Sequence, residues 1–471
     1  MTFAKRFERE EGGLTSGFFP GGKRSVSAYE PLLALERGVA YLLSQRLDER
    51  VAGDGRRIGI QSSLAVTPDG SLAIALYELL DGVVDGASLE ASTRERWRTL
   101  TAKIEQKLGF ALEPELFSNM LFVACTSNLE HPYLKRLSSI LLPTFKRSDA
   151  RGLYHFFTSL RFACDIDCTG MAARARLTAG DIDVSTESGR AELRQITERI
   201  LRSAAVRDVS AQENGSHGKE NGALTRHVFK VYLDDHEVQG AEYDRGLKNN
   251  PVVVANALFP VLFELSHGAR SDSEIIPLRE FAEGASVPRV GSASVAEIVV
   301  ANLRYLRRHL VSGAYKHGCR YYGSPDAFLC FYSELVAQFG PMTCILGSPE
   351  RLVEAIEERR NASGAGIQDP HSSLNCALRA IAAHNAGIDR TLELRALLDR
   401  QTDEGYFSDF GPLYSLGTSA TANIYFGSRE VTLAFALRAF APPGVVGPNL
   451  RRDPGWTRLL RQMALETRSL L

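Results

Sequence analysis

Two aspartates, Asp165 and Asp167, stand two residues apart in the segment RFACDIDCTG, between Phe162 and Met171. An Ala-rich stretch that could form a helix follows them. Two crowded carboxylates in apolar surroundings cannot both ionise cheaply, so the pKa of one of them should rise. The pair therefore predicts a neutral carboxylic acid near neutral pH, strong enough in an apolar setting to protonate a carbon–carbon double bond.

Composition narrows the class of protein. The chain has 471 residues, a net charge of -1, and hydrophobic and charged fractions of 44% and 24%. These values are typical of a globular protein and show no basic footprint for nucleic acid. No apolar run reaches the length of a membrane-spanning helix, and residues 1–9 lack the apolar core of a signal peptide, so we expect a cytoplasmic protein. Contact with a membrane surface and the oligomeric state are left open.

Metal and disulfide chemistry is not expected. The 7 cysteines are scattered, which fits reduced, buried thiols better than a disulfide framework. Cys164 and Cys168 form the one close pair, and no second Cys/His pair stands near them to complete a zinc site. Asp234, Asp235, His236 and Asp244 could hold a metal, but they flank a polar stretch and are interpreted as solvated.

Apolar residues recur at helical spacing along most of the chain, which predicts an all-α protein of about fifteen helices. We expect helices at 31–45, 72–80, 97–108, 115–124, 134–142, 171–177, 191–204, 252–265, 295–310, 327–339, 350–359, 374–384, 391–398, 431–440 and 456–470. The predicted organisation is an N-terminal extension (1–25), one helical domain (26–445) and a C-terminal helix (446–471). Residues 206–224 predict a mobile insertion and residues 288–294 an irregular connection.

A degenerate internal repeat in the sequence indicates how the helices associate. The stretch 152–157 (GLYHFF) leads into the Ala-rich stretch 169–175, and 405–408 (GYFS) leads into 432–439. In both, a Gly–aromatic turn precedes a Thr-initiated, Ala-rich helix whose small side chains allow close approach of neighbours. Repeated helical hairpins that close on themselves form an α/α toroid with a ligand cavity at its middle.

These residues resemble the terpene cyclase and prenyltransferase superfamily, whose members are α/α barrels. Residues 165–170 match the Asp-x-Asp-Asp-Thr-Ala acid motif of class II terpene cyclases, with Cys168 in place of the last Asp. Asp167-Cys168-Thr169 is also similar to the Asp-Cys-Thr-Ala segment of oxidosqualene cyclases. The resemblance implies that Asp167 is the general acid, that Asp165 supports it by shared hydrogen bonding, and that the Cys168 thiol is a weak donor to it.

The resemblance also implies a substrate class. Residues 401–407 (QTDEGYF) resemble the Gln/Gly/Trp repeat of these cyclases, although the chain has only 2 Trp, and no Asp-rich motif of class I enzymes is present. We therefore expect an isoprenoid substrate in a single barrel with insertions. Protonation needs no cofactor, and Mg²⁺ would be needed only for a diphosphate substrate. Candidate cavity-wall residues are Phe162, Tyr321, Tyr322, Tyr406, Phe407, Tyr425 and Phe426.

Alternatives accompany this interpretation. Either aspartate of the pair could simply cap the following helix, and Asn256, inside an apolar helix, needs a polar partner in a neighbouring loop or in the cavity. Asp181 and Asp183, a second Asp-x-Asp, are predicted to form a surface turn. Other functions remain open: a non-catalytic toroid that binds a hydrophobic ligand or a partner protein, or a sugar-processing hydrolase or lyase, which the shortage of Trp disfavours.

Overall fold

The computed structural model describes residues 29–45, 64–66, 73–75, 115–145, 153–157, 164–208, 225–233, 248–280 without 269, 289–409, 413–417 and 423–441, and a few single positions between 95 and 106. The single positions are helical, as predicted for 97–108. The predicted N-terminal extension, C-terminal helix, most of the insertion at 206–224 and the group from Asp234 to Asp244 lie outside the described residues.

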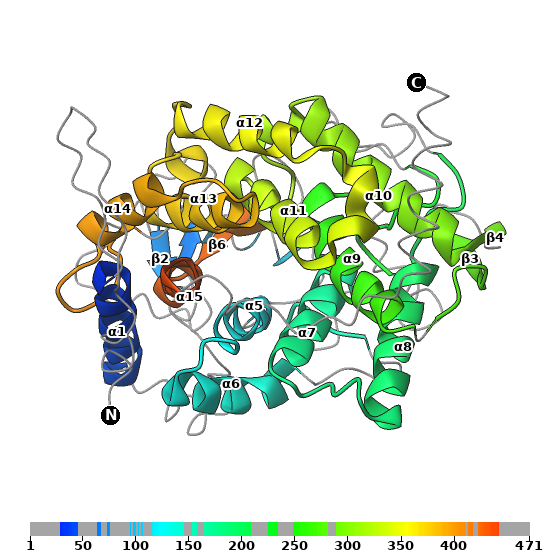
Figure 1. Cartoon of the computed structure of the whole chain (residues 1–471), viewed down its shortest axis with the longest axis horizontal. Coiled ribbons are helices and arrows are strands. Elements are labelled where there is room, and N and C mark those ends of the chain that lie inside the picture. The colour runs from blue at the N-terminus through cyan, green and yellow to red at the C-terminus, as the bar shows by residue number, and fades with distance from the viewer. Residues whose placement is uncertain are drawn as a thin grey trace, which may run out of the picture.

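Six of the described helices form an inner ring (Figure 1). They are α5 (Phe117–Thr126), α7 (Ile166–Thr178), α9 (Pro251–Ser266), α11 (Pro325–Phe339), α13 (Ser373–Asn385) and α15 (Arg429–Phe440). Each packs against the next in this order, and α15 packs against α5, which closes the ring. Every residue of α5 and α9 is buried, as expected for helices that are covered on all sides.

A second layer of helices surrounds this ring. It consists of α1 (Tyr29–Ser44), α6 (Pro132–Phe145), α8 (Glu187–Arg202), α10 (Val295–Val311), α12 (Pro349–Arg360) and α14 (Thr391–Arg400). The helix α6 packs on α5, α8 on α9, α10 on α9, α12 on α11, α14 on α13, and α1 on α15. The amphipathic pattern is clear in α8, where buried Leu193 and Ile196 alternate at helical spacing with exposed charged residues. The predicted α/α toroid is confirmed.

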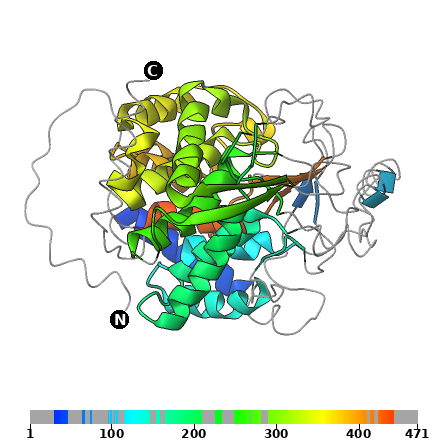
Figure 2. The same ribbon diagram turned by 90° about the vertical axis from the view of Figure 1, so that its right-hand side faces the viewer.

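Short strands correct two details of the prediction. The strands β1 (Leu64–Val66), β2 (Ala73–Ala75), β5 (Tyr414–Gly417) and β6 (Asn423–Gly427) form an antiparallel sheet in the order β2-β1-β6-β5. The strands β3 (Ile275–Glu280) and β4 (Arg289–Ser294) form a hairpin, drawn in green across the front of Figure 2. The helix predicted at 72–80 and the irregular connection at 288–294 were therefore wrong. Segments this short carry no period that distinguishes a strand from a helix or a loop, and pairing decides, with β1 for β2 and with β3 for β4.

Three short 3₁₀ helices, η4 (Ala314–His317), η5 (Gly340–Leu346) and η6 (Gly366–Gln368), connect the longer elements. The loop after η4 and before α11 contains Tyr321 and Tyr322. The strand β6 leads into α15, so the sheet and this loop both lie next to the beginnings of inner helices.

Gly170 allows α7 and α9 to approach closely. A Cβ at this position would lie 2.8 Å from Ala257 Cα and 2.9 Å from the Asn256 carbonyl oxygen, both backbone atoms that cannot turn aside. We expect Gly170→Ala to lower the free energy of unfolding by about 1–3 kcal/mol, the usual cost of overpacking. Urea denaturation would measure it. Gly291→Ala is the control, because its added methyl would meet only the Val206 side chain; an equal loss in both variants would contradict the backbone clash.

Candidate active site

Asp165 begins the helix that follows the acid motif. Its backbone is extended, and its Oδ1 accepts a hydrogen bond of 2.6 Å from the Cys168 backbone N–H, which makes it the N-cap of α7. The Thr169 hydroxyl donates to the Asp165 carbonyl oxygen at 2.8 Å and accepts from the Tyr154 N–H at 3.4 Å. The capping alternative therefore applies to Asp165, and Asp167 is left in the first turn of α7 without that task.

Asp167 is held by two neutral donors from other elements. Its Oδ1 accepts from Asn256 Nδ2 of α9, and its Oδ2 accepts from the Tyr322 hydroxyl in the loop before α11, both at 2.7 Å. Asn256 and Tyr322 are almost completely buried. We predicted that Asp165 and the Cys168 thiol would hold Asp167. Instead, both the backbone N–H and the thiol of Cys168 hydrogen bond to Asp165, because the side chains at 165 and 168 meet across the first helical turn.

Burial favours the neutral form of both carboxyl groups. It raises the pKa of Asp167 to about 6, against the opposing effect of the hydrogen bonds from Tyr322 and Asn256. Burial and the nearby negative charge of Asp167 raise the pKa of Asp165 to about 7. In contrast, Asp183 lies exposed in a turn, as predicted, and hydrogen bonds from Ser185 lower its pKa. Of these Asp-x-Asp pairs, the one at 165–167 has the environment of an acid.

A small cavity of about 40 Å³ lies beside the acid pair. It is at the end of the ring where α5, α7, α9 and α11 begin. Aromatic side chains dominate its wall. The lining residues are Phe117, Phe156, Asp165, Asp167, Cys168, Val231, Tyr232, Val253, Tyr321, Tyr322, Tyr414 and Ser415. The cavity combines two carboxyl groups of raised pKa with aromatic faces that can stabilise a cation.

The predicted wall residues have different positions. Tyr321 and Tyr322 line the cavity. Phe426 is buried behind it and stacks on Tyr414, with ring centroids 5.7 Å apart. The side chain of Tyr425, on β6, and the whole of Phe162 lie outside the described residues.

Tyr406 and Phe407 do not line the acid cavity. Tyr406 packs against Tyr41 of α1 at 5.1 Å between ring centroids, and Phe407 is fully buried. The Gln401 side chain donates to the Ala34 carbonyl oxygen of α1 at 2.9 Å, and Gly405 has a positive φ of 97° with no room for a Cβ beside α1. The Gln/Gly/aromatic turn therefore attaches to an outer helix, and Tyr406 faces α1 and not the cavity.

Sequence reasoning did not select Phe117, Phe156, Tyr232 and Tyr414 as wall residues. Phe156 belongs to the Gly–aromatic turn at 152–157, so its position before the acid motif was an available signal. Tyr414 lies 247 positions after Asp167 in the numbering, on a strand that the helical pattern did not predict. Only the packing of β5 against the ring brings it to the cavity.

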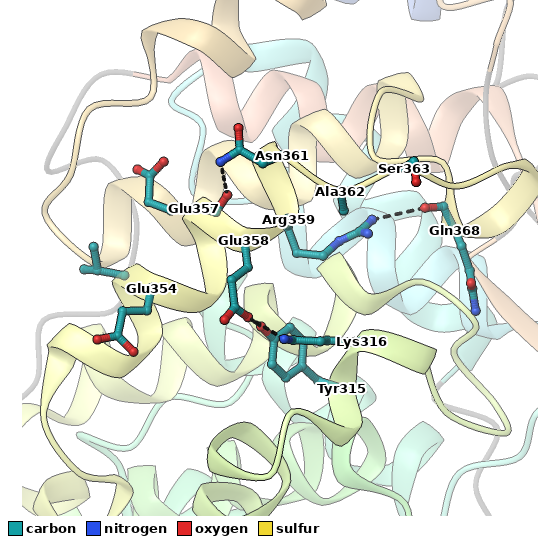
Figure 3. Close-up of a pocket in the computed structure, with 11 residues that line it drawn as sticks. Tyr315, Lys316, Glu354, Glu357, Glu358, Arg359, Asn361, Ala362, Ser363 and Gln368 are labelled. Carbon is teal, nitrogen blue, oxygen red and sulfur yellow. Dashed lines mark hydrogen bonds and ion pairs between the residues drawn. The ribbon is translucent and has the colours of Figure 1, made fainter.

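A larger hollow on the described surface has a different chemistry. It measures about 850 Å³ and lies outside the ring, over α12 and η4 (Figure 3). Within it, Glu358 accepts from the Tyr315 hydroxyl at 2.6 Å and pairs with Lys316 at 3.0 Å (Figure 3). The small cavity at the acid pair, by contrast, has two carboxyl groups of raised pKa in its wall.

The described residues show neither a cluster of metal ligands nor a membrane-spanning helix. They contain no group of three or more His, Cys, Asp or Glu side chains placed to hold a metal ion. No described helix is both long enough and apolar enough to cross a membrane.

Comparison with known proteins supports a relationship to cyclases. No family model matches the sequence. Over 139 residues, or 30% of this chain, the sequence is 30% identical to a drimenol cyclase of Aspergillus calidoustus. The chain is similar to terpene cyclases. The match spans about a quarter (24%) of the length of that curated relative.

Solved structures of terpene cyclases also align with the cyclase-like chain. The type II terpene cyclase MstE from Scytonema aligns with 88% of this chain and 98% of its own, at 10% identity and a TM-score of 0.48. Its complex with the substrate geranylgeranyl dihydroxybenzoate aligns over 88% and 97%, at 10% identity and a TM-score of 0.44. A protein from Actinoplanes aligns over 87% and 98%, at 14% identity and a TM-score of 0.47.

Proposed function

We propose that the protein cyclises an isoprenoid by protonating one of its double bonds, with Asp167 as the general acid. The observation that supports this most directly is the pairing of a partly buried carboxyl, of raised pKa, with a cavity walled by aromatic rings. Proton transfer creates a carbocation, and the faces of residues such as Tyr232 and Tyr321 would stabilise it as the rings close.

Asp167 is a better donor than Asp165 because its conjugate base has two hydrogen bonds from neutral groups, Asn256 and Tyr322. These bonds stabilise the carboxylate that remains after proton transfer. Asp165 is engaged as the cap of α7. With a pKa of about 7, it is mostly protonated below neutrality, so it does not place a second negative charge beside Asp167. Asp165 is therefore a positioning residue.

Substrate binding must enlarge the cavity. Its volume of about 40 Å³ is far below the roughly 300–1,000 Å³ of typical small-molecule sites. Tyr232 and Tyr321 are only partly buried and touch edge to face, with ring centroids 6.2 Å apart. We expect these two rings to separate when a prenyl chain enters, and to cover it afterwards so that water does not quench the cation.

The function is tested by incubating the purified protein with farnesyl diphosphate, geranylgeranyl diphosphate, squalene, oxidosqualene and a prenylated dihydroxybenzoate. We expect a cyclised product by gas or liquid chromatography with mass spectrometry. In D₂O, one deuterium should enter at the protonated carbon. Saturable binding without conversion would support the non-catalytic hydrophobic-ligand alternative, and an absence of both binding and conversion would contradict the proposal.

The pH dependence of the reaction should report the pKa of Asp167. Because the protonated acid is the active form, we expect kcat to fall as the pH rises through about 6. The Tyr322 hydrogen bond lowers this pKa, so its removal in Tyr322→Phe should raise it and move the alkaline limb upward by about 1 pH unit. Tyr332→Phe is the control, since the Tyr332 hydroxyl donates to the Leu346 carbonyl oxygen and Tyr332 is not among the residues that line the acid cavity. Coincident profiles for wild type and Tyr322→Phe would contradict the assignment.

A further inference from the structure

A chain of three hydrogen-bonded side chains, Tyr414, Ser118 and Glu115, starts at the acid cavity. The Tyr414 ring lines the same cavity as Asp167, and its hydroxyl lies 2.7 Å from Ser118 Oγ. The Ser118 hydroxyl donates to Glu115 Oε1 at 2.5 Å. With the Ser118 hydrogen given to Glu115, Ser118 Oγ is left as an acceptor for the Tyr414 hydroxyl, which also hydrogen bonds to the Glu115 carboxylate. The hydrogen bonds therefore run in one direction, from the cavity to Glu115.

Glu115 is a buried acceptor at the end of this chain of hydrogen bonds. Only 6% of its surface is exposed. Its Oε2 also accepts from the Ser118 backbone N–H at 2.9 Å, at the beginning of α5, where the helix dipole favours a negative charge. Burial and the negative charge of Glu115 raise the pKa of the Tyr414 hydroxyl well above its usual range. Tyr414 therefore stays protonated and can pass a proton on only by accepting one at the same time.

Aromatic rings pack around the ring of Tyr414. Phe117 and Phe156 contact the Tyr414 ring edge to face, with centroids 5.1 and 5.8 Å away, and Phe426 stacks on it. Such rings attract a carbocation and exclude water. A cation that reaches this wall therefore meets a proton acceptor rather than solvent.

We propose that Tyr414, Ser118 and Glu115 remove the proton that ends the cyclisation, so that the product is an alkene. This inference rests on the proposed function. A C–H bond next to the cationic carbon breaks, and its electron pair forms the new double bond. The proton binds Tyr414 Oη, the Tyr414 hydrogen moves to Ser118 Oγ, and the Ser118 hydrogen moves to Glu115 Oε1. Glu115 ends as a neutral acid, and the positive charge of the substrate is gone. A carbocation is so acidic that a carboxylate of ordinary basicity is sufficient.

A merely structural role for Glu115 is the competing explanation, since its carboxylate also accepts from the first turn of α5. Glu115→Gln separates the two roles. The amide oxygen can still accept the Ser118 N–H, but the side chain can no longer take up a proton. Tyr414→Phe removes the relay at the cavity while leaving Glu115 and its contacts with α5 in place.

The experiment measures the distribution of products made by wild type, Glu115→Gln, Ser118→Ala and Tyr414→Phe, with melting temperatures recorded for each. A ratio among products does not depend on the overall rate. We expect the fraction of the wild-type alkene to fall at least 10-fold in Glu115→Gln and Tyr414→Phe, with alcohols or isomeric alkenes in its place. Tyr332→Phe, far from the cavity, should keep the wild-type distribution.

Other results would overturn the proposal. Wild-type product ratios in both Glu115→Gln and Tyr414→Phe would exclude the relay while leaving Asp167 as the acid. A wild-type product that is wholly an alcohol would do the same, because water and not Glu115 would then end the reaction. A wild-type protein that cyclises none of the substrates would overturn the proposed function and the relay together.

Discussion

Asp167→Asn should lower kcat for cyclisation by about 10²–10⁴-fold, the usual contribution of general acid catalysis, because Asp165, the other carboxyl at the cavity, is engaged as the cap of α7. The amide has nearly the shape of the carboxyl group and can still accept from Tyr322 or Asn256, so the cavity should persist. Product formation per enzyme, followed by chromatography under single-turnover conditions, measures the loss.

Two control variants accompany this measurement. Asp183→Asn removes an exposed aspartate of the second Asp-x-Asp pair and should retain wild-type activity. Asp165→Asn keeps an N-cap side chain for α7 and should lose less activity than Asp167→Asn, because Asp165 only positions the donor. Cyclised product formed at the wild-type rate by Asp167→Asn would exclude the acid assignment.

Stability should distinguish loss of the acid from loss of the fold. The pKa of Asp167 is about 6 in the folded chain and 3.8 as its ordinary value, so the folded state binds this proton more tightly than the unfolded state. Stability therefore falls as the pH rises from about 4 to about 6, and stays reduced above it. The neutral amide of Asp167→Asn removes this dependence, so we expect its melting temperature at pH 8 to be no lower than that of the wild type.

Asp326→Ala should destabilise the protein by about 3–5 kcal/mol, the cost of leaving buried charges without their partner. Asp326, at the beginning of α11, is fully buried. Its carboxylate accepts from Arg359 of α12 at 2.7 Å and from Arg379 of α13 at 3.3 Å. Arg379 in turn pairs with Glu393 of α14 at 3.0 Å. One carboxylate thus joins two inner helices to the outer layer, and its removal leaves two buried guanidinium groups short of an acceptor.

The measurement is the free energy of unfolding from urea denaturation at constant pH. The matched control is Glu354→Ala, which breaks an ion pair of 2.7 Å with Arg351 on the exposed face of α12. Exposed ion pairs contribute little, so this variant should unfold close to the wild type. Equal stability losses in the two variants would show that burial of the Asp326 network has no special role.

Local patterns in the sequence predicted the helices and the acid motif, because both depend on residues close together along the chain. Helical periodicity reflects side chains three and four positions apart. It predicted most of the inner helices, including the Ala-rich α7, and the Gly–aromatic repeats predicted that the helices close into a toroid. The pattern failed at 73–75, where a strand forms instead of the predicted helix, and the segment 289–294, predicted as an irregular connection, forms a strand by pairing with β3.

The partners of the acid are distant in the sequence. Asn256 lies 89 positions from Asp167, and Tyr322 lies 155 positions from it. The sequence indicates that Asn256 is a buried amide in need of a partner and that Tyr322 is an aromatic wall residue. No pattern along the chain pairs either residue with Asp167, because only the closed ring brings them together. The same holds for Tyr414 and Ser118, which are 296 positions apart.

Crowded carboxylates at the beginning of an Ala-rich helix, within a repetitive helical protein, can be predicted from the sequence because they are properties of neighbouring residues. Which aspartate caps the helix, and which one is held by Asn256 and Tyr322 at an aromatic cavity, depends on the packing of the whole chain. This packing also places Glu115 behind Tyr414. Burial raises the pKa values of the two carboxyl groups, and it arises only when the inner helices pack into a ring. The same packing brings the hydrogen-bond donors Asn256 and Tyr322 to Asp167.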